Sequence, residues 1–456
     1  MYDEPLKVTG ELRLAELLSA MSCALDLTEG QPIGHCIRCC WIGHHIGREL
    51  GLTDQALSDL YYMLLLKDLG CSSNAARICE LYLTDDLTFK HDFKTWDGSL
   101  PAALRFVLSH TGLQSGLAER FRALVTVMVE GGEIAKELIE TRCYRGADIA
   151  RKLRFSEDVA LGIRSLDEQW DGKGLPDRLA GEDIPNYSRI ALLSQVIDVF
   201  HTASGPEAAL SEAKKRAGSW FDPTMVEAFE AVSASSDFWQ MLASPDLHDK
   251  IYLIEPAQIA RRVDEDYLDE IAEAFAKVVD SKSPFTSGHS ERVTVFTDLI
   301  AEQLGYSVTK RRWLKRAALL HDIGKLGVSN SVLDKPGKLD DEEFAQIKMH
   351  PVYSLNILKN ITAFSDIAGI AGGHHERLDG KGYPYGLKGA EIDMDTRIVT
   401  VADIFDALTA DRPYRKAMPI SKALSIMWDM VDEAIDPVCF EALKVALDRI
   451  GEKIAA

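Results

Sequence analysis

The fold is decided by the stretch His321-Asp322-Ile323-Gly324-Lys325, which follows directly on a helical segment. Apolar residues three and four apart predict helices at three stretches, Val293 to Leu304, Arg311 to Leu320 and Glu342 to Met349. Asp340 and Glu343 form a capping pair before the last of these. Few segments alternate apolar and polar residues as a half-buried strand does, so the sequence predicts an all-α fold.

Part of this pattern occurs twice in the chain. Gly34-His35 and Gly288-His289 each precede a helical stretch. In each copy a second helix then ends in Asp-x-Gly, at Asp68-Leu69-Gly70 and at Asp322-Ile323-Gly324. The spacing from His to Asp is 33 residues in both copies (35 to 68 and 289 to 322), and the copies are offset by 254 (35 to 289).

A later segment repeats with a different offset. Asp171-Gly172-Lys173-Gly174-Leu175-Pro176 mirrors Asp379-Gly380-Lys381-Gly382-Tyr383-Pro384 at an offset of 208 (171 to 379), and the same offset relates Asp198 to Asp406. The difference between 254 and 208 predicts an insertion of 46 residues in the N-terminal copy, within 72–141.

A repeat this long indicates two copies of one helical domain rather than a solenoid. We predict two tandem helical bundles, an N-terminal domain at 1–245 and a C-terminal domain at 281–456. The intervening residues 246–280 are rich in charge and helix formers, which predicts a helical linker.

The composition restricts the functional class. The formal net charge of −20 argues against a DNA-binding protein, because such proteins present a basic face. No apolar run reaches the roughly 18 residues of a membrane helix. The N-terminus lacks a signal-peptide pattern, and eight cysteines in 456 residues do not suggest a disulfide framework. We therefore expect a soluble, cytoplasmic protein that binds neither DNA nor membranes.

Histidines and aspartates gather in the C-terminal copy. The set comprises seven residues: His289, His321, Asp322, His350, His374, His375 and Asp403. Imidazole and carboxylate groups are ligands that suit first-row transition metals, and an adjacent His-Asp pair can add a carboxylate that bridges two ions. The set therefore predicts a site for two metal ions. His91-Asp92 and His248-Asp249 lie outside the repeat and are interpreted as ordinary polar pairs.

These residues belong to a longer series of spaced motifs. After His321 to Lys325 come Lys335-Pro336-Gly337-Lys338-Leu339, His350-Pro351 and the stretch from His374-His375-Glu376 to Gly382-Tyr383-Pro384. The series resembles the HD-GYP domain, a branch of the HD phosphohydrolase superfamily that acts on bacterial cyclic dinucleotides. The resemblance covers residues 280–440 and implies a metal-dependent phosphodiesterase.

The resemblance also implies how the two ions are held. One ion would be bound by His289, His321, Asp322 and Asp403, and the other by Asp322, His350, His374 and His375, so that Asp322 bridges them. Fe, Mn and Ni are the divalent ions implied. Some family members use a Glu four residues before the first histidine to bind a third ion. Phe285 occupies that position here, so we predict two ions.

Further residues are expected to act on the substrate. Asp322 and Lys325 would be catalytic, with Lys325 neutralising charge on the phosphate. The glycine-rich loop after Asp379 is expected to place Tyr383 against the ligand, although a structural or partner-docking role for this loop stays open. Arg412 and Arg415 would supply the local positive charge that a phosphate ligand needs in so acidic a chain.

The N-terminal copy has lost most of the metal ligands. His35 and Asp68 match His289 and Asp322. The positions of His321, Lys325, His350, His374, His375 and Asp403 are occupied by Lys67, Cys71, Arg142, Leu166, Asp167 and Gln195. Lys and Arg have no acceptor atom and repel a metal, so we predict that this copy binds no metal pair. We expect a scaffold rather than a sensor, and we interpret the cluster around Cys36 and Cys39 as packing.

The expected reaction is hydrolysis of a phosphodiester in a cyclic dinucleotide to give a linear dinucleotide. Cyclic di-GMP is the family's usual substrate, and 3′,3′-cyclic GMP-AMP is the alternative. A non-catalytic receptor that signals through partner proteins is disfavoured by the intact ligand set. A different HD hydrolase acting on nucleoside phosphates is disfavoured by the Gly-Tyr-Pro loop. Whether the chain forms a homodimer or binds a signalling partner stays open.

Overall fold

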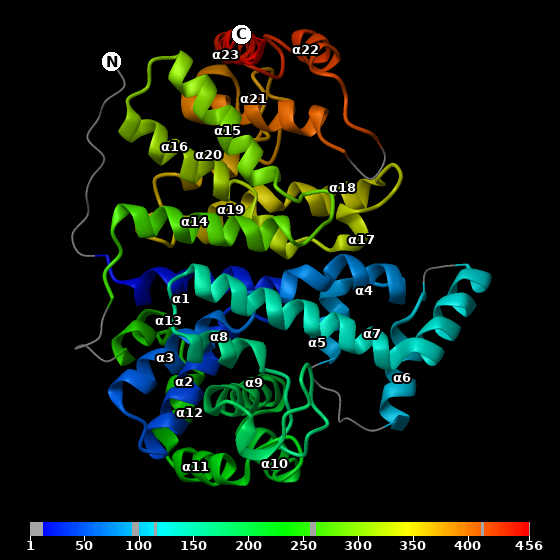
Figure 1. Cartoon of the computed structure of the whole chain (residues 1–456), viewed down its shortest axis with the longest axis vertical. Helices are drawn as coiled ribbons and strands as arrows, with labels where there is room; N and C mark the ends of the chain where they lie inside the picture. The colour runs from blue at the N-terminus through cyan, green and yellow to red at the C-terminus, as the bar shows by residue number, and fades with distance from the viewer. Residues whose placement is uncertain (1–11, 94–99, 114–115, 256–260, 412–414, 456) are drawn as a thin grey trace. The chain divides into compact units, whose positions relative to one another are not determined.

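The structure is a computed structural model that describes residues 12–93, 100–113, 116–255, 261–411 and 415–455. The chain divides into two compact units, Leu12–Asp264 and Glu265–Ala456, called here the N-terminal and C-terminal units. Both are built from helices (Figure 1). Among the described residues, extended segments pair only as isolated bridges, such as that between Asp379 and Lys388. The all-α prediction is confirmed.

The N-terminal unit places α2 between α3 and α9, while the long helix α7 packs against α4 and α8. Its α-helices are α1 (Leu14–Thr28), α2 (His35–Glu49), α3 (Asp54–Leu66), α4 (Ala75–Tyr82), α5 (Asp86–Phe93), α6 (Leu100–His110), α7 (Leu117–Lys152), α8 (Glu157–Arg164), α9 (Asn186–Ser204), α10 (Pro206–Lys215), α11 (Pro223–Ser233), α12 (Ser236–Leu242) and α13 (Leu247–Lys250). Short 3₁₀ turns are η1 (Cys71–Asn74), η2 (Gly181–Asp183) and η3 (Ile251–Ile254). Helices α4, α5 and α6 lie within residues 72–141, the stretch predicted to contain the insertion.

The C-terminal unit places α15 against α16, α21 and α23, and α19 against α20. Its α-helices are α14 (Glu265–Asp280), α15 (His289–Gln303), α16 (Val308–Leu320), α17 (Asn330–Leu333), α18 (Asp341–Lys348), α19 (His350–Leu358), α20 (Ala368–Gly373), α21 (Met394–Thr409), α22 (Ile420–Trp428) and α23 (Pro437–Ala455). Two 3₁₀ turns are η5 (Ile323–Gly327) and η6 (Gly389–Glu391).

The sequence-predicted helices correspond to α15, α16 and α18, within a few residues at each end. The start of α18 also behaves as predicted. The Asp340 carboxylate accepts a hydrogen bond from the Glu343 amide, and Glu343 accepts one from the Asp340 amide. This reciprocal pair satisfies backbone donors that a helix start leaves without a partner.

The segment predicted as a helical linker, 246–280, differs from one continuous helix. Glu255, which ends η3, has an extended backbone conformation, and Pro256 follows it in the sequence. Helix α14 then buries an apolar face that includes Ile271 and Phe275. Because this face packs against α15 and α16, α14 is part of the C-terminal unit's core rather than a linker between the two domains.

One close backbone approach sets the position of α19. A Cβ atom at Gly324 would lie 2.0 Å from the carbonyl oxygen of His350, so only glycine allows this approach. A Cβ at Gly70 would likewise lie 1.8 Å from the carbonyl oxygen of Arg142. The helix start carrying His350 is thereby held beside Asp322, and the N-terminal copy repeats the arrangement.

None of the described helices combines the length and the apolar character that a membrane span requires.

Candidate metal centre

The C-terminal unit brings the seven predicted ligands into one cluster. Six are buried, and His375 is half-buried. They come from helix ends and helix starts: His289 begins α15, His350 begins α19, and His321 and His374 directly follow α16 and α20. Asp403 lies on α21. Segments far apart in the sequence therefore meet at one point.

Asp322 lies at the middle of the cluster, and each of its two carboxylate oxygens faces a different pair of histidines. Oδ2 is 3.3 Å from Nε2 of His289 and 3.3 Å from Nε2 of His321. Oδ1 is 3.3 Å from Nε2 of His350 and 3.6 Å from Nε2 of His374. A carboxylate placed in this way can bridge two cations.

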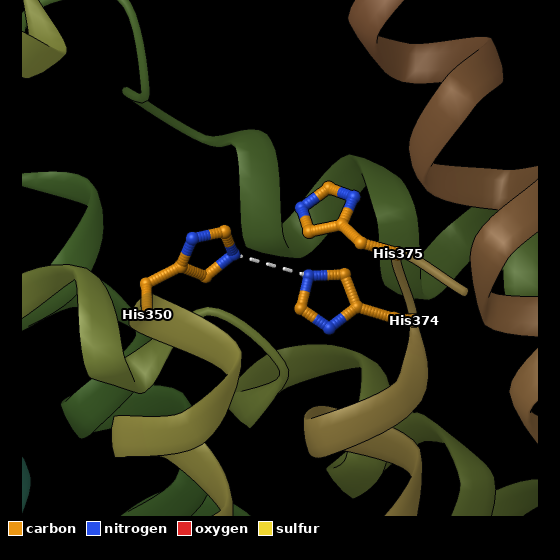
Figure 2. A group of neighbouring side chains, drawn as sticks. All are labelled: His350, His374 and His375. Atoms are coloured by element: carbon orange, nitrogen blue, oxygen red, sulfur yellow. Dashed lines mark hydrogen bonds between the residues drawn. The ribbon is translucent and has the colours of Figure 1, made fainter. Parts of the chain in front are cut away.

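The remaining ligands extend these two groups. Asp403 Oδ1 lies 3.4 Å from His289 Nε2 and 4.0 Å from His321 Nε2. On the other side, three imidazoles each offer a nitrogen within 4.8 Å of the others: His350, His374 and His375 (Figure 2).

Three of the histidines are held by the carbonyl groups of helix ends. Nδ1 of His321, His350 and His374 lies 2.7 Å from the carbonyl oxygens of Ala318, Ile347 and Ala371 respectively, three residues earlier in each case. A carbonyl only accepts, so Nδ1 carries the proton and Nε2 carries the lone pair. The negative ends of these helices also favour a cation nearby.

With the lone pairs on Nε2, the contacts between these side chains show whether they fit metal ions. His350 Nε2 and His374 Nε2 lie 3.4 Å apart, yet two lone pairs cannot form a hydrogen bond with each other. In addition, Nε2 of His289, Nε2 of His321 and Oδ1 of Asp322 are buried without a hydrogen-bond partner among the described residues. Buried polar atoms in proteins seldom lack a partner. The lone pairs of these nitrogen and oxygen atoms point toward one another, and divalent cations would satisfy them.

The ionisation states of His350, His374, His375 and Asp322 agree with this fit. Burial lowers the pKa of His350 to about 4 and also lowers the pKa of His374 and His375. Burial raises the pKa of Asp322, but His321 and Lys325 outweigh it and hold that pKa well below its usual range. Neutral imidazole and ionised carboxylate are the forms that bind metals. Burial lowers the pKa of His289, but its contacts with Asp322 and Asp406 outweigh burial and raise that pKa to about 9, so His289 must lose a proton to bind a cation.

A further residue, Asp406, supports the cluster from behind. Its Oδ2 accepts a hydrogen bond from His289 Nδ1 at 2.7 Å, and its Oδ1 accepts one from Arg292 Nε at 2.6 Å. A carboxylate behind a ligating histidine fixes the ring orientation and the tautomer. Sequence reasoning noted Asp406 only as a repeat of Asp198 and assigned it no role. The repeat itself was the signal that could have found it.

Replacing Asp406 by asparagine is expected to weaken metal binding by about 10- to 100-fold. The amide keeps the shape but loses the charge that orients His289 and pairs with Arg292. Competition with a metal-sensitive chelator measures the change. The matched control is Asp395→Asn on the same helix, whose carboxylate binds Tyr306 and Lys310 instead. Equal metal affinity in both variants would contradict a supporting role for Asp406.

Lys325 and Tyr383 lie next to the cluster. The Lys325 ammonium contacts Asp322 Oδ2, and its side chain is 17% exposed. The Tyr383 ring stacks on His375, with ring centroids 4.7 Å apart and planes inclined by 28°. The Glu376 carboxylate accepts hydrogen bonds from two backbone amides of the loop, at Tyr385 and Leu387. The Gly-Tyr-Pro loop is thereby fixed against the histidines.

The two predicted arginines are placed differently. Arg415 donates to the carbonyl oxygens of Ala407, Leu408 and Lys416, so its guanidinium satisfies the C-terminal end of α21. Arg412 lies outside the described residues. A contact of either arginine with substrate stays a prediction.

Comparison with known proteins places this site in a family. The model of the HD domain matches residues 116–225 and 273–439, one segment in each unit. A 3′,3′-cGAMP-specific phosphodiesterase of Vibrio cholerae, numbered 3, is 54% identical over 440 residues, covering 96% of both chains.

The chain belongs to the HD domain family. A crystal structure of a cyclic GMP-AMP-specific phosphodiesterase of Vibrio cholerae superimposes with a TM-score of 0.66 at 49% identity, covering 96% of this chain and 98% of that one. A cyclic di-GMP phosphodiesterase of Thermotoga maritima is 38% identical over 199 residues, 43% of this chain and 54% of that one. The resemblance to the HD-GYP branch is confirmed. The metal dependence of the HD family supports divalent ions as cofactors.

The N-terminal HD domain keeps the supports of this site. His35 Nδ1 bonds to Asp198 Oδ2 at 2.6 Å, and Arg38 Nε bonds to Asp198 Oδ1 at 2.6 Å, as His289, Arg292 and Asp406 do in the other copy. Glu168 accepts hydrogen bonds from two loop amides, as Glu376 does. The helical framework of an HD domain thus persists where the ligands differ.

Two of the ligand positions of the N-terminal HD domain hold cationic side chains instead. The buried Lys67 ammonium contacts Asp68 Oδ2, and Arg142 Nε donates to Asp167 Oδ2 at 3.0 Å. The positive charges of Lys67 and Arg142 occupy the positions at which His321 and His350 present nitrogen lone pairs in the C-terminal copy. They support the prediction that this HD domain binds no metal pair.

Replacing Lys67 by alanine is expected to lower the opening free energy of α3 by about 3–5 kcal/mol, because Asp68 would stay buried without that ammonium. Hydrogen exchange of the α3 amides, followed by mass spectrometry, measures this energy. The double variant Lys67→Met, Asp68→Asn removes both charges and should lose much less. Equal losses in the two variants would show that the ion pair is not the cause.

Proposed function

We propose that the C-terminal HD domain hydrolyses a phosphodiester bond of a cyclic dinucleotide, using two divalent transition-metal ions. The observation that carries this proposal is the position of Asp322, whose two oxygens each face two histidine nitrogens. His289, His321 and Asp403 would hold one ion together with Asp322, and His350, His374 and His375 would hold the other together with Asp322. Fe, Mn and Ni suit such nitrogen-rich sets.

When bound, a pair of divalent ions lowers the pKa of a shared water and neutralises charge on the phosphoryl group. The protein's own residues orient and complete the site. Asp322 lies between the two groups of histidines. The helix-end carbonyls accept hydrogen bonds from Nδ1 of His321, His350 and His374, so Nε2 of each ring faces the cluster. Burial of the cluster excludes bulk water and strengthens the electrostatic interactions within it.

Lys325 and Tyr383 would act on the substrate. Lys325 contacts the same Asp322 oxygen that faces His289 and His321. Its partly exposed ammonium would donate a hydrogen bond to a phosphate oxygen when Asp322 holds the metal ions. Tyr383 presents an aromatic ring beside His375, on which a nucleobase can stack.

We further propose 3′,3′-cyclic GMP-AMP as the preferred substrate. The 54% identity to the Vibrio cholerae enzyme of that specificity extends across both HD domains of this chain. The cyclic di-GMP phosphodiesterase of Thermotoga maritima matches less than half of the chain and at lower identity. The intact ligand cluster disfavours the alternative of a non-catalytic receptor.

A product assay tests both levels of the proposal. Purified chain loaded with Mn²⁺ or Fe²⁺ receives equal concentrations of 3′,3′-cyclic GMP-AMP and cyclic di-GMP, and chromatography follows the linear products. We expect both to be cut, with the mixed dinucleotide consumed faster. Preference for cyclic di-GMP would overturn the substrate proposal alone. The absence of linear product from either, in protein with two ions per chain, would overturn the proposed reaction.

A further inference from the structure

The N-terminal unit contains an open cavity of about 590 Å³ that no step of the proposed reaction uses. One wall comes from the predicted insertion and α7, including Tyr82, Phe89 and Leu138. The lining also contains former ligand positions, including Arg142 on α7 and Gln195 on α9. The cavity therefore lies at the place that corresponds to the metal-ligand positions of the other copy, since Arg142, Asp167 and Gln195 line it. Its volume is that of a typical small-molecule site.

The charges that line this cavity are already balanced within the protein. The ionisable side chains comprise three acids and three bases: Glu29, Asp167, Asp171, Lys90, Arg142 and Lys173. Arg142 Nε donates a hydrogen bond to Asp167 Oδ2 at 3.0 Å, and Lys173 Nζ donates one to Asp171 Oδ2 at 2.6 Å.

The third base is also engaged. The buried Lys90 ammonium donates to the carbonyl oxygens of Thr28 at 3.0 Å and Cys71 at 2.7 Å. A ligand with two phosphates would therefore enter a site of zero net charge in which each cation is already occupied. Desolvating such a ligand without compensating charge is costly. The cavity therefore differs in chemistry from the active site.

The remaining lining is mostly aromatic and aliphatic. The rings of Tyr82 and Phe89 pack with centroids 4.4 Å apart. The Trp220 ring is held by the Arg216 guanidinium, 4.2 Å from its centroid. Gln195, at the position of Asp403, contributes an amide that can both donate and accept a hydrogen bond. A planar apolar molecule with one polar group would match this lining.

We propose that the N-terminal HD domain binds an uncharged small molecule with a mainly apolar, aromatic body in this cavity. The degenerate copy is then a ligand-binding domain whose ligand differs in charge from the substrate of the active copy. This inference stands on the cavity alone and does not depend on the reaction proposed for the C-terminal HD domain.

The probe for the test is N-phenyl-1-naphthylamine, a neutral aromatic fluorophore, added to the full chain. We expect fluorescence enhancement that saturates at one probe per chain. Ala135, on α7, lines the cavity, so Ala135→Trp should weaken binding at least tenfold. Ala203→Trp, at an exposed site on α9, adds the same side chain outside the cavity and should bind the probe as the wild type does.

A second measurement uses the wild-type chain and does not depend on how the variants fold. Saturating probe should slow hydrogen exchange in α5 and the middle of α7, with α15 and α16 unchanged. Enhancement that does not saturate, or protection confined to the C-terminal unit, would overturn the proposal. Displacement of the probe by 3′,3′-cyclic GMP-AMP in a His321→Ala, Asp322→Ala background would also overturn it, because the cavity would then be a nucleotide site.

Discussion

Replacing Asp322 by alanine is expected to remove both metal ions and to lower kcat by more than about 1,000-fold. Each oxygen of this carboxylate faces two histidine nitrogens, so one substitution takes a ligand from both groups. It also places five imidazoles close together without the anion that separates them. Inductively coupled plasma mass spectrometry measures the metal content, and single-turnover assays measure the rate.

The internal repeat offers a matched control for this variant. Asp68 occupies the equivalent position in the N-terminal HD domain, where it contacts Lys67. The double variant Lys67→Met, Asp68→Asn should keep the wild-type metal content and turnover within about twofold, since neither residue belongs to the active cluster. One ion retained at full occupancy in Asp322→Ala would show that the two groups bind independently and would refute the bridging role.

Replacing Lys325 by methionine is expected to lower kcat by about 100- to 1,000-fold while the metal content stays that of the wild type. Methionine keeps an unbranched chain of similar length and removes the ammonium, which is the group expected to meet the developing phosphate charge. Arginine at this position should restore part of the rate. Steady-state assays at saturating substrate give kcat, and metal analysis of the same preparations accompanies them.

The control for Lys325 is Lys359→Met, an exposed lysine after α19 whose ammonium binds Asn356. It should leave kcat unchanged. If Lys325→Met instead loses metal in proportion to activity, the ammonium acts by holding Asp322 in place. A contact with the phosphate would then be excluded as the main effect.

Spaced sequence motifs predict much of this site. They identify the residues that the structure brings together around Asp322, because the series from His321 to Pro384 resembles the HD-GYP domain. They could not show that Nδ1 of His321 and His374 binds a helix-end carbonyl, since that contact depends on where each helix stops. The role of Asp406 was also missed, because its partner His289 is 117 residues away in the sequence.

The fold was predictable to a similar degree. Amphipathic periodicity is a local property, so α15, α16 and α18 followed from it. Charge and helix formers predict a helical linker at 246–280, whereas the apolar face of α14 is buried in the C-terminal unit. The cavity of the N-terminal unit lies between the insertion and residues distant in sequence, so no local pattern indicates it.

The duplicated framework makes the N-terminal copy a ready acceptor for a grafted catalytic centre. The glycine approach at Gly70, the carboxylate behind His35 and the anchored loop are already in place there. Only five side chains stand at ligand positions without matching the other copy: Lys67, Arg142, Leu166, Asp167 and Gln195. Exchanging these for their counterparts would transplant the whole donor set without redesigning a single helix. Such a graft would ask whether an HD scaffold alone is enough to recruit metal.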